Sequence, residues 1–428
     1  MSHSLIRTLR QTDLTLLLVG TVIGSGIFLV PGAVLRDSGG HVGLAVIVWL
    51  VGGVLSLLGA LTYGELAAAS PEAGGIYVYI RDAFGRLPAF LYGWALFFVI
   101  SSGSLATLAV AFTAYTTQFV ALSPYAARLV SILVIIVIAI VNIVGTRRSA
   151  NVQNLTTAVK VGALLVMSGL LMAMGGGLST VAQQPWPDLT SPALLASLGT
   201  AMIGVLWAYE GWQYVTFSAG EAINPQRTFP RALAIGTTAL IGIYLVANIA
   251  YVAALGPVTV ATSNRVASEA VTALFGPAAG MLIAAAILVS IFSAANGLTL
   301  TAPRVYYAMA KDRLFFERLA SVHPRFGTPA FAIATSSAWA IVLAATGTFE
   351  QLLTYVVFAG WLFYALGAMS IFVYRRHAPN AARPFSVPGY PLTPALFILA
   401  ALAIVLNTIV VQPGRAVVGI GLVLVGVP

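Results

Sequence analysis

The chain has 428 residues, of which 59% are hydrophobic and only 8% are charged. Soluble globular domains carry about 25% charged residues, so this composition excludes that class and predicts a polytopic helical membrane protein. The sequence contains no cysteine, which excludes disulfide bonds, thiolate metal sites and thiol redox chemistry.

Apolar stretches of about 20 residues, the length of a membrane-spanning helix, recur along the whole chain. We predict twelve spans, at residues 14–35, 43–68, 88–119, 127–145, 153–175, 195–219, 231–255, 277–303, 329–346, 351–374, 391–411 and 415–428. The last one is short, because at 1.5 Å per residue it covers ~21 Å of a ~30 Å hydrocarbon core. The residues before the first span are polar, so we expect no cleavable signal peptide.

The basic residues are divided unevenly between the two sides that these spans define. Most of them precede the first span or follow an even-numbered span. The exceptions are Arg36, Arg128, Arg265 and Arg415, while Lys160 lies inside the fifth span. By the positive-inside rule, we predict a multi-pass cell-membrane protein with both termini in the cytoplasm. The net charge of +9 then reflects topology and a lipid bilayer partner rather than binding to nucleic acid.

Two of the spans contain residues that interrupt a helix. The first contains GTVIGSGIF at 20–28, and the sixth contains GVLWAYEGW at 204–212. Glycine weakens a helix and frees backbone N–H and C=O groups, which cannot stay unpaired in hydrocarbon. Because the breaks occupy corresponding positions in the two halves of the chain, they predict the substrate site of a secondary transporter.

Two ionisable residues lie well inside predicted spans, where burying a charge is costly. Lys160 could extend its ammonium to the cytoplasmic interface, or it could be a fixed cation that binds carbonyls freed at the first break. Its desolvated ammonium could also carry a proton. Glu210 could face a water-filled vestibule, or it could lie near a substrate amine.

The first break offers backbone groups that suit a carboxylate. Gly24, Ser25 and Gly26 resemble an anion nest, in which the N–H groups and the positive dipole end of a half-helix face the cavity. Carbonyls of the preceding half-helix and of residues 207–210 suit an ammonium group. Together these groups predict a site for an α-amino acid, although close helix packing is the alternative explanation of a single Gly-x-Gly.

No catalytic or metal-binding pattern accompanies this predicted site. The histidines, at positions 3, 41, 323 and 377, are scattered and form no ligand set. Neither a Ser/His/Asp arrangement nor a phosphate-binding loop is present. We therefore expect no metal, no cofactor and no enzymatic activity.

These motifs resemble those of the amino acid–polyamine–organocation superfamily, and in particular of its L-type amino acid transporter subfamily. The resemblance rests on residues 20–28, on LWAYEGW at 206–212 with EAINP at 221–225, and on SIFSAANG at 290–297 before Pro303-Arg304. It covers nearly the whole chain and implies an all-α integral membrane protein with the LeuT-type fold, whose helices 1 and 6 are broken. The single domain, 1–428, would contain a 5+5 inverted repeat, 14–175 and 195–374, and two additional helices in 391–428.

The resemblance also assigns roles to individual residues. The substrate carboxylate would bind backbone N–H groups, and its amine would bind carbonyls. These groups would belong to Gly24, Ser25 and Gly26 for the carboxylate and to Val22, Trp207, Ala208 and Glu210 for the amine. Trp207 would also be an aromatic gate, and Lys160 would replace a sodium ion. The side-chain pocket would include Ser104, Asn296 and Phe358.

The activity that the resemblance implies is sodium-independent transport of L-amino acids by alternating access, as an exchanger of neutral amino acids. A proton-coupled symporter in which Lys160 titrates is one alternative, and an amino-acid-binding sensor or a channel is another. Animal members of the subfamily bond a glycoprotein heavy chain through a cysteine. Because this chain has none, we expect no disulfide-linked heavy chain.

Overall fold

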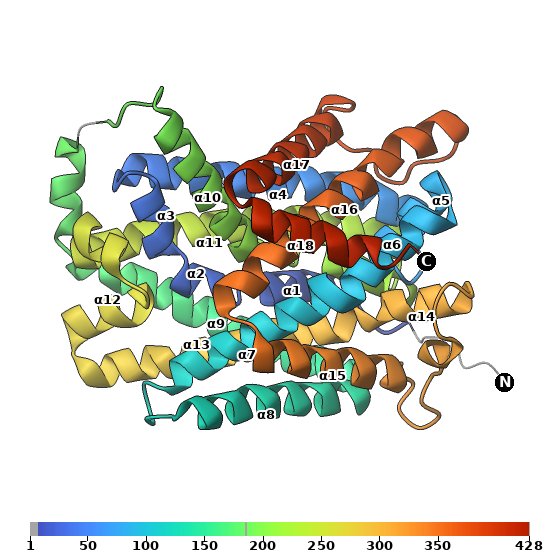
Figure 1. Ribbon diagram of the computed structural model, residues 1–428, viewed down its shortest axis with the longest axis horizontal. Coiled ribbons are helices and arrows are strands. Elements are labelled where there is room, and N and C mark those ends of the chain that lie inside the picture. The colour runs from blue at the N-terminus through green and yellow to red at the C-terminus, as the bar shows by residue number, and fades with distance from the viewer. Residues whose placement is uncertain (1–6, 185, 428) are drawn as a thin grey trace.

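The computed structural model describes residues 7–184 and 186–427, and this part of the chain is built of helices (Figure 1). Its β-type pairing is limited, among the described residues, to an isolated bridge between Leu9 and Ala222. A helix satisfies its backbone groups within one segment, as lipid requires. The all-helical structure therefore follows from the apolar composition.

The helices of the first half are α1 (Gln11–Val22), α2 (Gly26–Leu29), α3 (Pro31–Asp37), α4 (Val42–Ala69), α5 (Ile76–Phe84), α6 (Arg86–Ala95), the π-helix η1 (Leu96–Ile100), α7 (Ser101–Thr116), α8 (Pro124–Ile143) and α9 (Thr146–Met174). The 3-10 helix η2 (Gly177–Gln183) follows them. The helices of the second half are α10 (Pro192–Ala208), η3 (Tyr214–Glu221), α11 (Pro225–Thr262), α12 (Val266–Phe275), α13 (Pro277–Thr301), α14 (Pro303–Lys311), η4 (Glu317–Ala320), α15 (Ala330–Thr346), α16 (Phe349–His377), α17 (Leu392–Val411) and α18 (Pro413–Leu424).

Nine helices in the described part of the chain are long and apolar enough to cross a membrane. They coincide with nine of the twelve predicted spans, and the other three spans coincide with the shorter apolar helices α10, α15 and α18. The short helix α12 lies between two predicted spans. Pro428, the end of the last predicted span, lies outside the described residues.

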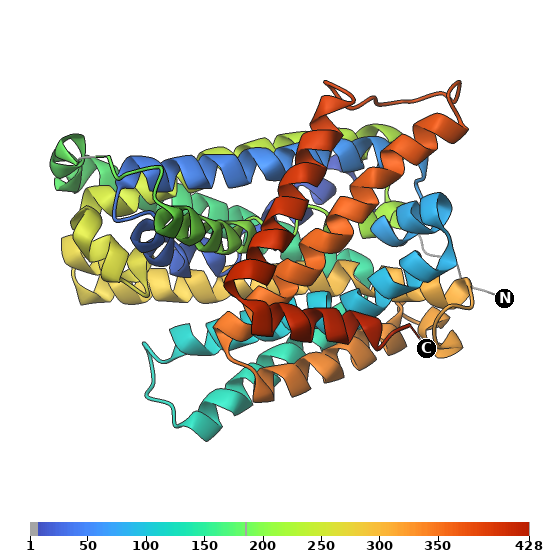
Figure 2. The ribbon, with the colours of Figure 1, turned by 45° about the horizontal axis from the view of Figure 1, so that its top comes forward.

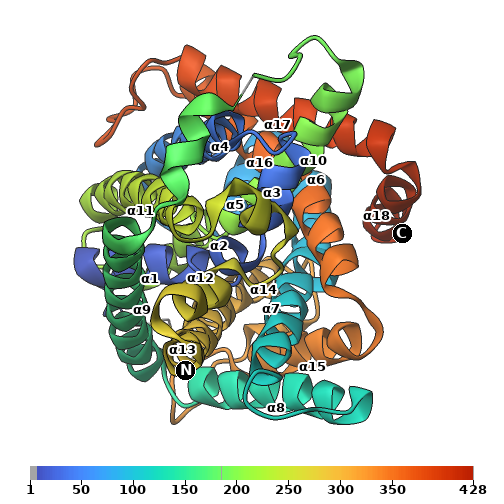
Figure 3. The ribbon, with the colours of Figure 1, turned by 90° about the vertical axis from the view of Figure 1, so that its left-hand side faces the viewer.

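The long helices run side by side and enclose the two broken ones. The helices α4, α9, α11 and α13 follow the long axis of the molecule (Figure 1), while α16 and α17 pack together at an incline to it (Figure 2). Viewed along the long axis, α2 lies near the centre of the bundle (Figure 3). Because α1 packs against α9, α11 and α13, the first break is surrounded by protein rather than by lipid.

The outer helices expose apolar side chains. Ile140 on α8, Val166 on α9 and Leu399 on α17 are 54%, 65% and 64% exposed. A soluble protein rarely shows such contiguous apolar surface. These faces are therefore the ones that contact the hydrocarbon of the bilayer.

Both predicted breaks are present. Helix α1 ends at Val22 and α2 begins at Gly26, while α10 ends at Ala208 and η3 begins at Tyr214. Gly211, between the latter two, has φ +124°, a backbone conformation that residues with a Cβ rarely adopt. Glycine therefore shapes the second interruption, and the first contains Gly24 between the two helices.

A π-helical turn, η1, lies within the third predicted span. The hydroxyl of Ser102 donates to the carbonyl of Phe97 (2.6 Å), and the indole N–H of Trp339 donates to the carbonyl of Phe98 (2.9 Å). Side chains thus bind two carbonyls of this wider turn. The turn immediately precedes α7, which reaches the centre of the bundle.

Candidate functional site

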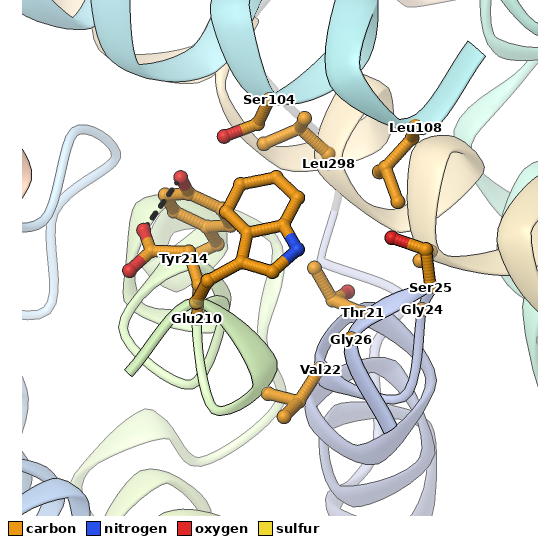
Figure 4. A pocket seen from close by; sticks show the side chains of 12 residues that line it. Thr21, Val22, Gly24, Ser25, Gly26, Ser104, Leu108, Glu210, Tyr214 and Leu298 are labelled. Carbon is orange, nitrogen blue, oxygen red and sulfur yellow. Dashed lines mark hydrogen bonds between the residues drawn. The ribbon is translucent and has the colours of Figure 1, made fainter. Parts of the chain in front are cut away.

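A small cavity lies between the two helix breaks. It is lined by Thr21, Val22, Gly24, Ser25, Gly26, Ser104, Leu108, Trp207, Glu210, Tyr214, Ala294 and Leu298. Glu210 and Tyr214 lie on one side of it, and Gly24, Ser25 and Gly26 lie on the other (Figure 4). Its volume of about 20 Å³ holds little more than one water molecule. The site is therefore closed, and side chains must move before it admits a larger molecule.

The first break leaves polar groups beside this cavity without hydrogen-bond partners among the described residues. The N-terminus of α2 has no side-chain cap, and its first helical hydrogen bonds are donated by Phe28 and Leu29 to the carbonyl of Ser25 (both 3.1 Å). The hydroxyl of Ser25 is buried and lacks a hydrogen-bond partner among the described residues. An unpaired buried donor costs about 1–3 kcal/mol, which a ligand in the cavity would relieve.

Gly26 brings the two breaks into direct contact. A Cβ atom built on Gly26 would lie 2.6 Å from the Cα atom of Ala208, well inside the ~3.5 Å at which carbon atoms pack. Glycine is therefore required here for the close approach of two backbones. This close packing and the predicted anion nest are properties of the same few residues.

The carboxylate of Glu210 lies at the second break and is held by three side chains. Its Oε1 accepts hydrogen bonds from Gln213 Nε2 (2.7 Å), the Tyr214 hydroxyl (2.8 Å) and the Tyr364 hydroxyl (2.5 Å). None of the described residues donates to Oε2 or forms a salt bridge with this carboxylate. Burying a charge without such a partner is costly. Glu210 lines the cavity, and Oε2 is the oxygen of this carboxylate that has no donor among the described residues.

Tyr244 on α11 joins the two breaks through backbone carbonyls. Its hydroxyl lies 3.1 Å from the carbonyl oxygen of Val22 and 2.8 Å from that of Ala208. The carbonyl of Trp207 accepts from the N–H of Glu210 (3.0 Å). Because a tyrosine hydroxyl has one proton, these donors satisfy at any one time two of the three carbonyls, all of which are predicted to bind a substrate amine.

Lys160 reaches the first break from α9. Its ammonium donates to the carbonyls of Gly20, Ile23 (2.6 Å) and, more weakly, Ser290 (3.4 Å). The residue is 2% exposed, and no carboxylate in the described residues pairs with it. Three N–H donors face three acceptors. The ammonium therefore points to the break rather than to a membrane interface.

The three residues predicted for a side-chain pocket lie in different places. Ser104 lines the cavity. Asn296 is buried elsewhere, where its amide accepts from Asn142 Nδ2 (3.0 Å) and donates to Gln153 Oε1 (3.0 Å). Phe358 packs beside Gly419 of α18. The lining of the closed cavity therefore includes Ser104 but neither Asn296 nor Phe358.

A buried ion pair seals one end of the site. Arg304 Nε binds Glu221 Oε2 (2.7 Å), and both side chains are at most 2% exposed. The hydroxyl of Thr146 donates to Glu221 Oε1 (3.1 Å). Arg147 pairs with Asp13 at the start of α1 (2.9 Å). These contacts connect α1, η3, α9 and α14, so the molecule is closed toward the end where α1 begins.

A second cluster strengthens the same end outside the predicted spans. Arg81 and the Tyr77 hydroxyl both donate to Asp312 Oδ2 (2.7 and 2.8 Å). Burial and the hydrogen bond to this carboxylate raise the pKa of Tyr77. Tyr77 therefore stays protonated and continues to donate, which ties α5 to the end of α14.

Comparisons with known proteins show the family to which the chain belongs. Residues 9–425 match the family model described as amino acid permease. The chain is 32% identical over 415 residues to the serine/threonine exchanger SteT of Bacillus subtilis, covering 96% of this chain and 93% of that protein. It is 31% identical to the mouse b(0,+)-type amino acid transporter 1, covering 93% of this chain and 81% of the relative. For the human cystine/glutamate transporter the identity is 31%, with coverage of 96% and 82%.

Proposed function

Because the chain belongs to the amino acid permease family of the amino acid–polyamine–organocation superfamily, we propose that it is a sodium-independent exchanger of neutral L-amino acids. The family and the relatives are amino acid transporters rather than enzymes, so transport is its general function. Neutral substrates and exchange are supported by the relative named as a serine/threonine exchanger. Without cysteine, the chain cannot form a disulfide bond to a heavy chain.

The observation that carries sodium independence is the placement of Lys160. Its ammonium binds carbonyls of the first break and of α13, where another transporter would hold a sodium ion. A sodium ion is coordinated by the same kind of oxygen ligands, so the two cations would compete for one position. All three N–H groups already have acceptors, which favours a fixed charge over a proton carrier.

The proposed substrate position uses the opposite polarity of the two breaks. The backbone N–H groups of Ser25 and Gly26 would bind the carboxylate, assisted by the unpaired Ser25 hydroxyl. The amine would lie toward Val22 and the second break, where Glu210 Oε2 is free. We therefore add the Glu210 side chain to the carbonyls first predicted for the amine.

Transport requires that the closed cavity open alternately to the two sides. In the proposed LeuT-type arrangement, residues 14–175 and 195–374 form the inverted repeats, and both termini are cytoplasmic. Arg304–Glu221 and Arg147–Asp13 would then close the cytoplasmic side. Trp207, which lines the cavity and is 6% exposed, would be the side chain that moves to admit substrate.

The second candidate is a proton-coupled symporter, and one observation favours it. Lys160 is buried with no carboxylate partner among the described residues, so no fixed negative charge holds its proton. In that mechanism Lys160 would titrate in each cycle. An amino-acid sensor or a channel would use the same cavity without substrate accumulation.

Uptake of radiolabelled serine into proteoliposomes separates these functions. Vesicles are preloaded with unlabelled serine or left empty, in sodium-free buffer, with and without an inward proton gradient. Uptake that needs internal serine and ignores the gradient supports the exchanger. Uptake into empty vesicles driven by the gradient supports the symporter. Saturable binding without uptake would indicate a sensor, and unitary conductance would indicate a channel.

A further inference from the structure

A second, larger cavity lies on the sealed end of the molecule, away from the substrate site. Its volume is about 360 Å³, and it is bordered by Thr8, the turn between α8 and α9, and the loop at 325–327. Cβ atoms built on Gly145 and Gly327 would meet open space. This cavity, which we call the basic cavity because Arg147, Arg148 and Arg325 border it, can therefore hold a group much larger than water.

The charges that line the basic cavity are not balanced. Its only described carboxylate, Glu221, is already bound by Arg304. Arg147 pairs with Asp13, whereas Arg148 and Arg325 pair with no carboxylate in the described residues. Both arginines border the cavity and are exposed, and a guanidinium group without a carboxylate partner is free to bind a polyoxygen anion, since its fork matches carboxylate or phosphate geometry.

Packing and hydrogen bonds hold several residues that border the basic cavity in place. The guanidinium of Arg325 lies over the ring of Phe326, 5.5 Å from its centroid. The Thr328 hydroxyl donates to the carbonyl of Ile143 (2.8 Å), which fixes this loop beside the end of α8. The hydroxyl of Thr8, which borders the cavity, has no partner in the described chain. The uncapped start of α9 at Thr146 adds positive dipole.

We propose that the basic cavity binds a phosphate group, carried by an anionic phospholipid headgroup or by a soluble phosphate, through Arg148 and Arg325. Phosphate offers several oxygen acceptors and the negative charge that the lining lacks. Basic pockets beside membrane-spanning helices bind lipid headgroups in this manner.

Occupancy of the cavity stabilises the closed end of the transporter. Thr146 and Arg147 border the cavity and also bind Glu221 and Asp13. Opening this end separates α9 from η3 and from the start of α1, which takes the cavity wall apart. A bound phosphate therefore favours the closed arrangement. This second step rests on the alternating-access function proposed above, whereas binding itself does not.

Binding is tested by calorimetric titration of the purified full chain in neutral detergent. The probes are dioctanoyl phosphatidylglycerol, inorganic phosphate and, as a zwitterionic control, dioctanoyl phosphatidylcholine. The test variant is R148Q/R325Q. The matched control, R318Q/R376Q, removes two exposed arginines that do not border the cavity. We expect the test variant to bind the anionic probes about tenfold more weakly or worse, and the control to bind as the unmodified protein does.

The outcomes distinguish the sources of phosphate. Binding of phosphatidylglycerol alone identifies a lipid headgroup, and binding of inorganic phosphate as well extends the site to soluble phosphates. If neither probe binds, or if both double variants bind equally well, the proposal is overturned. Unchanged thermal unfolding of R148Q/R325Q without ligand shows that the loss is not a folding defect.

Stabilisation of the closed end is tested separately with a single introduced cysteine. Ser218 in η3 is fully buried between the substrate cavity and Glu221, and the chain has no other cysteine. Phosphatidylglycerol should slow maleimide labelling of S218C several-fold, and R148Q/R325Q should abolish this effect. Labelling that is equally fast with and without phosphatidylglycerol would overturn the coupling. Failure of exchange in the uptake assay would instead contradict the proposed function.

Discussion

Lys160 and Glu210 are two buried charges that the molecule accommodates in different ways. The ammonium of Lys160 is surrounded by backbone carbonyls. The carboxylate of Glu210 is surrounded by side-chain donors, all bound to one oxygen. Neither has an ionic partner in the described chain, unlike the buried pair Arg304–Glu221.

The difference separates a permanent role from an exchangeable one. Backbone carbonyls freed at a helix break need a donor at all times, because hydrocarbon supplies none. Lys160 supplies such a donor to the carbonyls of Gly20 and Ile23. Glu210 keeps one oxygen without a donor beside the cavity, so its hydrogen bonding is completed only when a ligand arrives. We therefore propose that the first charge holds the scaffold and that the second contacts substrate.

Lys160→Ala would test the permanent role and has the largest expected effect. It leaves the carbonyl of Gly20 without this donor and the carbonyl of Ile23 with only the Ser290 hydroxyl (3.1 Å), and an unpaired buried group costs about 1–3 kcal/mol. We expect exchange in proteoliposomes to fall by about a hundredfold or more, with less effect on expression. The control is Lys311→Ala, an exposed lysine. Normal exchange by K160A would contradict the hypothesis that Lys160 holds the scaffold.

Gly26→Ala tests whether the first break depends on contact with the second. The new Cβ would collide with Ala208, so the breaks must separate and the carboxylate site is lost. We expect serine binding, measured by scintillation proximity, to weaken about a hundredfold while folded protein remains in the membrane. Gly162→Ala, whose Cβ meets open space, is the matched control. Equal affinities of the two variants would contradict this dependence.

Glu210→Gln tests the exchangeable role, that is, whether the charge of Glu210 contributes to substrate binding. Glutamine keeps an oxygen for the Tyr214 and Tyr364 hydroxyls but removes the charge. We expect the dissociation constant for serine to rise about tenfold or more, since a hydrogen bond to a charged group contributes about 1.5–3 kcal/mol. The exposed Glu269→Gln is the control. An unchanged constant in E210Q would place the amine on backbone carbonyls alone.

Tyr244→Phe has the smallest expected effect. It removes the hydroxyl that contacts the carbonyls of Val22 and Ala208, and substrate donors can replace it. We expect the exchange rate to fall several-fold, up to about tenfold. Tyr251→Phe on the same helix removes a buried hydroxyl without a described partner and should be neutral. Identical losses in the two variants would indicate general packing damage.

The sequence predicts features that depend on local pattern. Span positions follow from apolar length, and both breaks follow from glycine-rich segments inside apolar runs. Lys160 could be singled out because a charge in a span is costly. The structure adds that its ammonium points to the first break, which the sequence pattern alone left open.

Contacts between distant segments were not predictable. Tyr364, which donates to Glu210, lies 154 residues from it in the sequence. Nothing in the sequence distinguishes Tyr244 from other residues of an apolar helix. The tyrosines in apolar spans could have indicated such contacts, since a buried hydroxyl needs a hydrogen-bond partner. Asn296 was expected near the pocket, yet it binds Asn142 and Gln153. Tertiary packing decides which face of α13 meets α7, and the sequence does not give that packing.

The π-helical turn η1 affects the direction in which two lining residues of the cavity, Ser104 and Leu108, point. A π turn is equivalent to one residue inserted in an α-helix, and each α-helical residue turns the chain by about 100°. If all five residues Leu96–Ile100 became α-helical without the loss of one, Ser104 and Leu108 would rotate by about 100° relative to α6, whereas deleting one residue of the turn would leave their direction unchanged. The register of α7 against the cavity thus depends on the one extra residue that this turn accommodates.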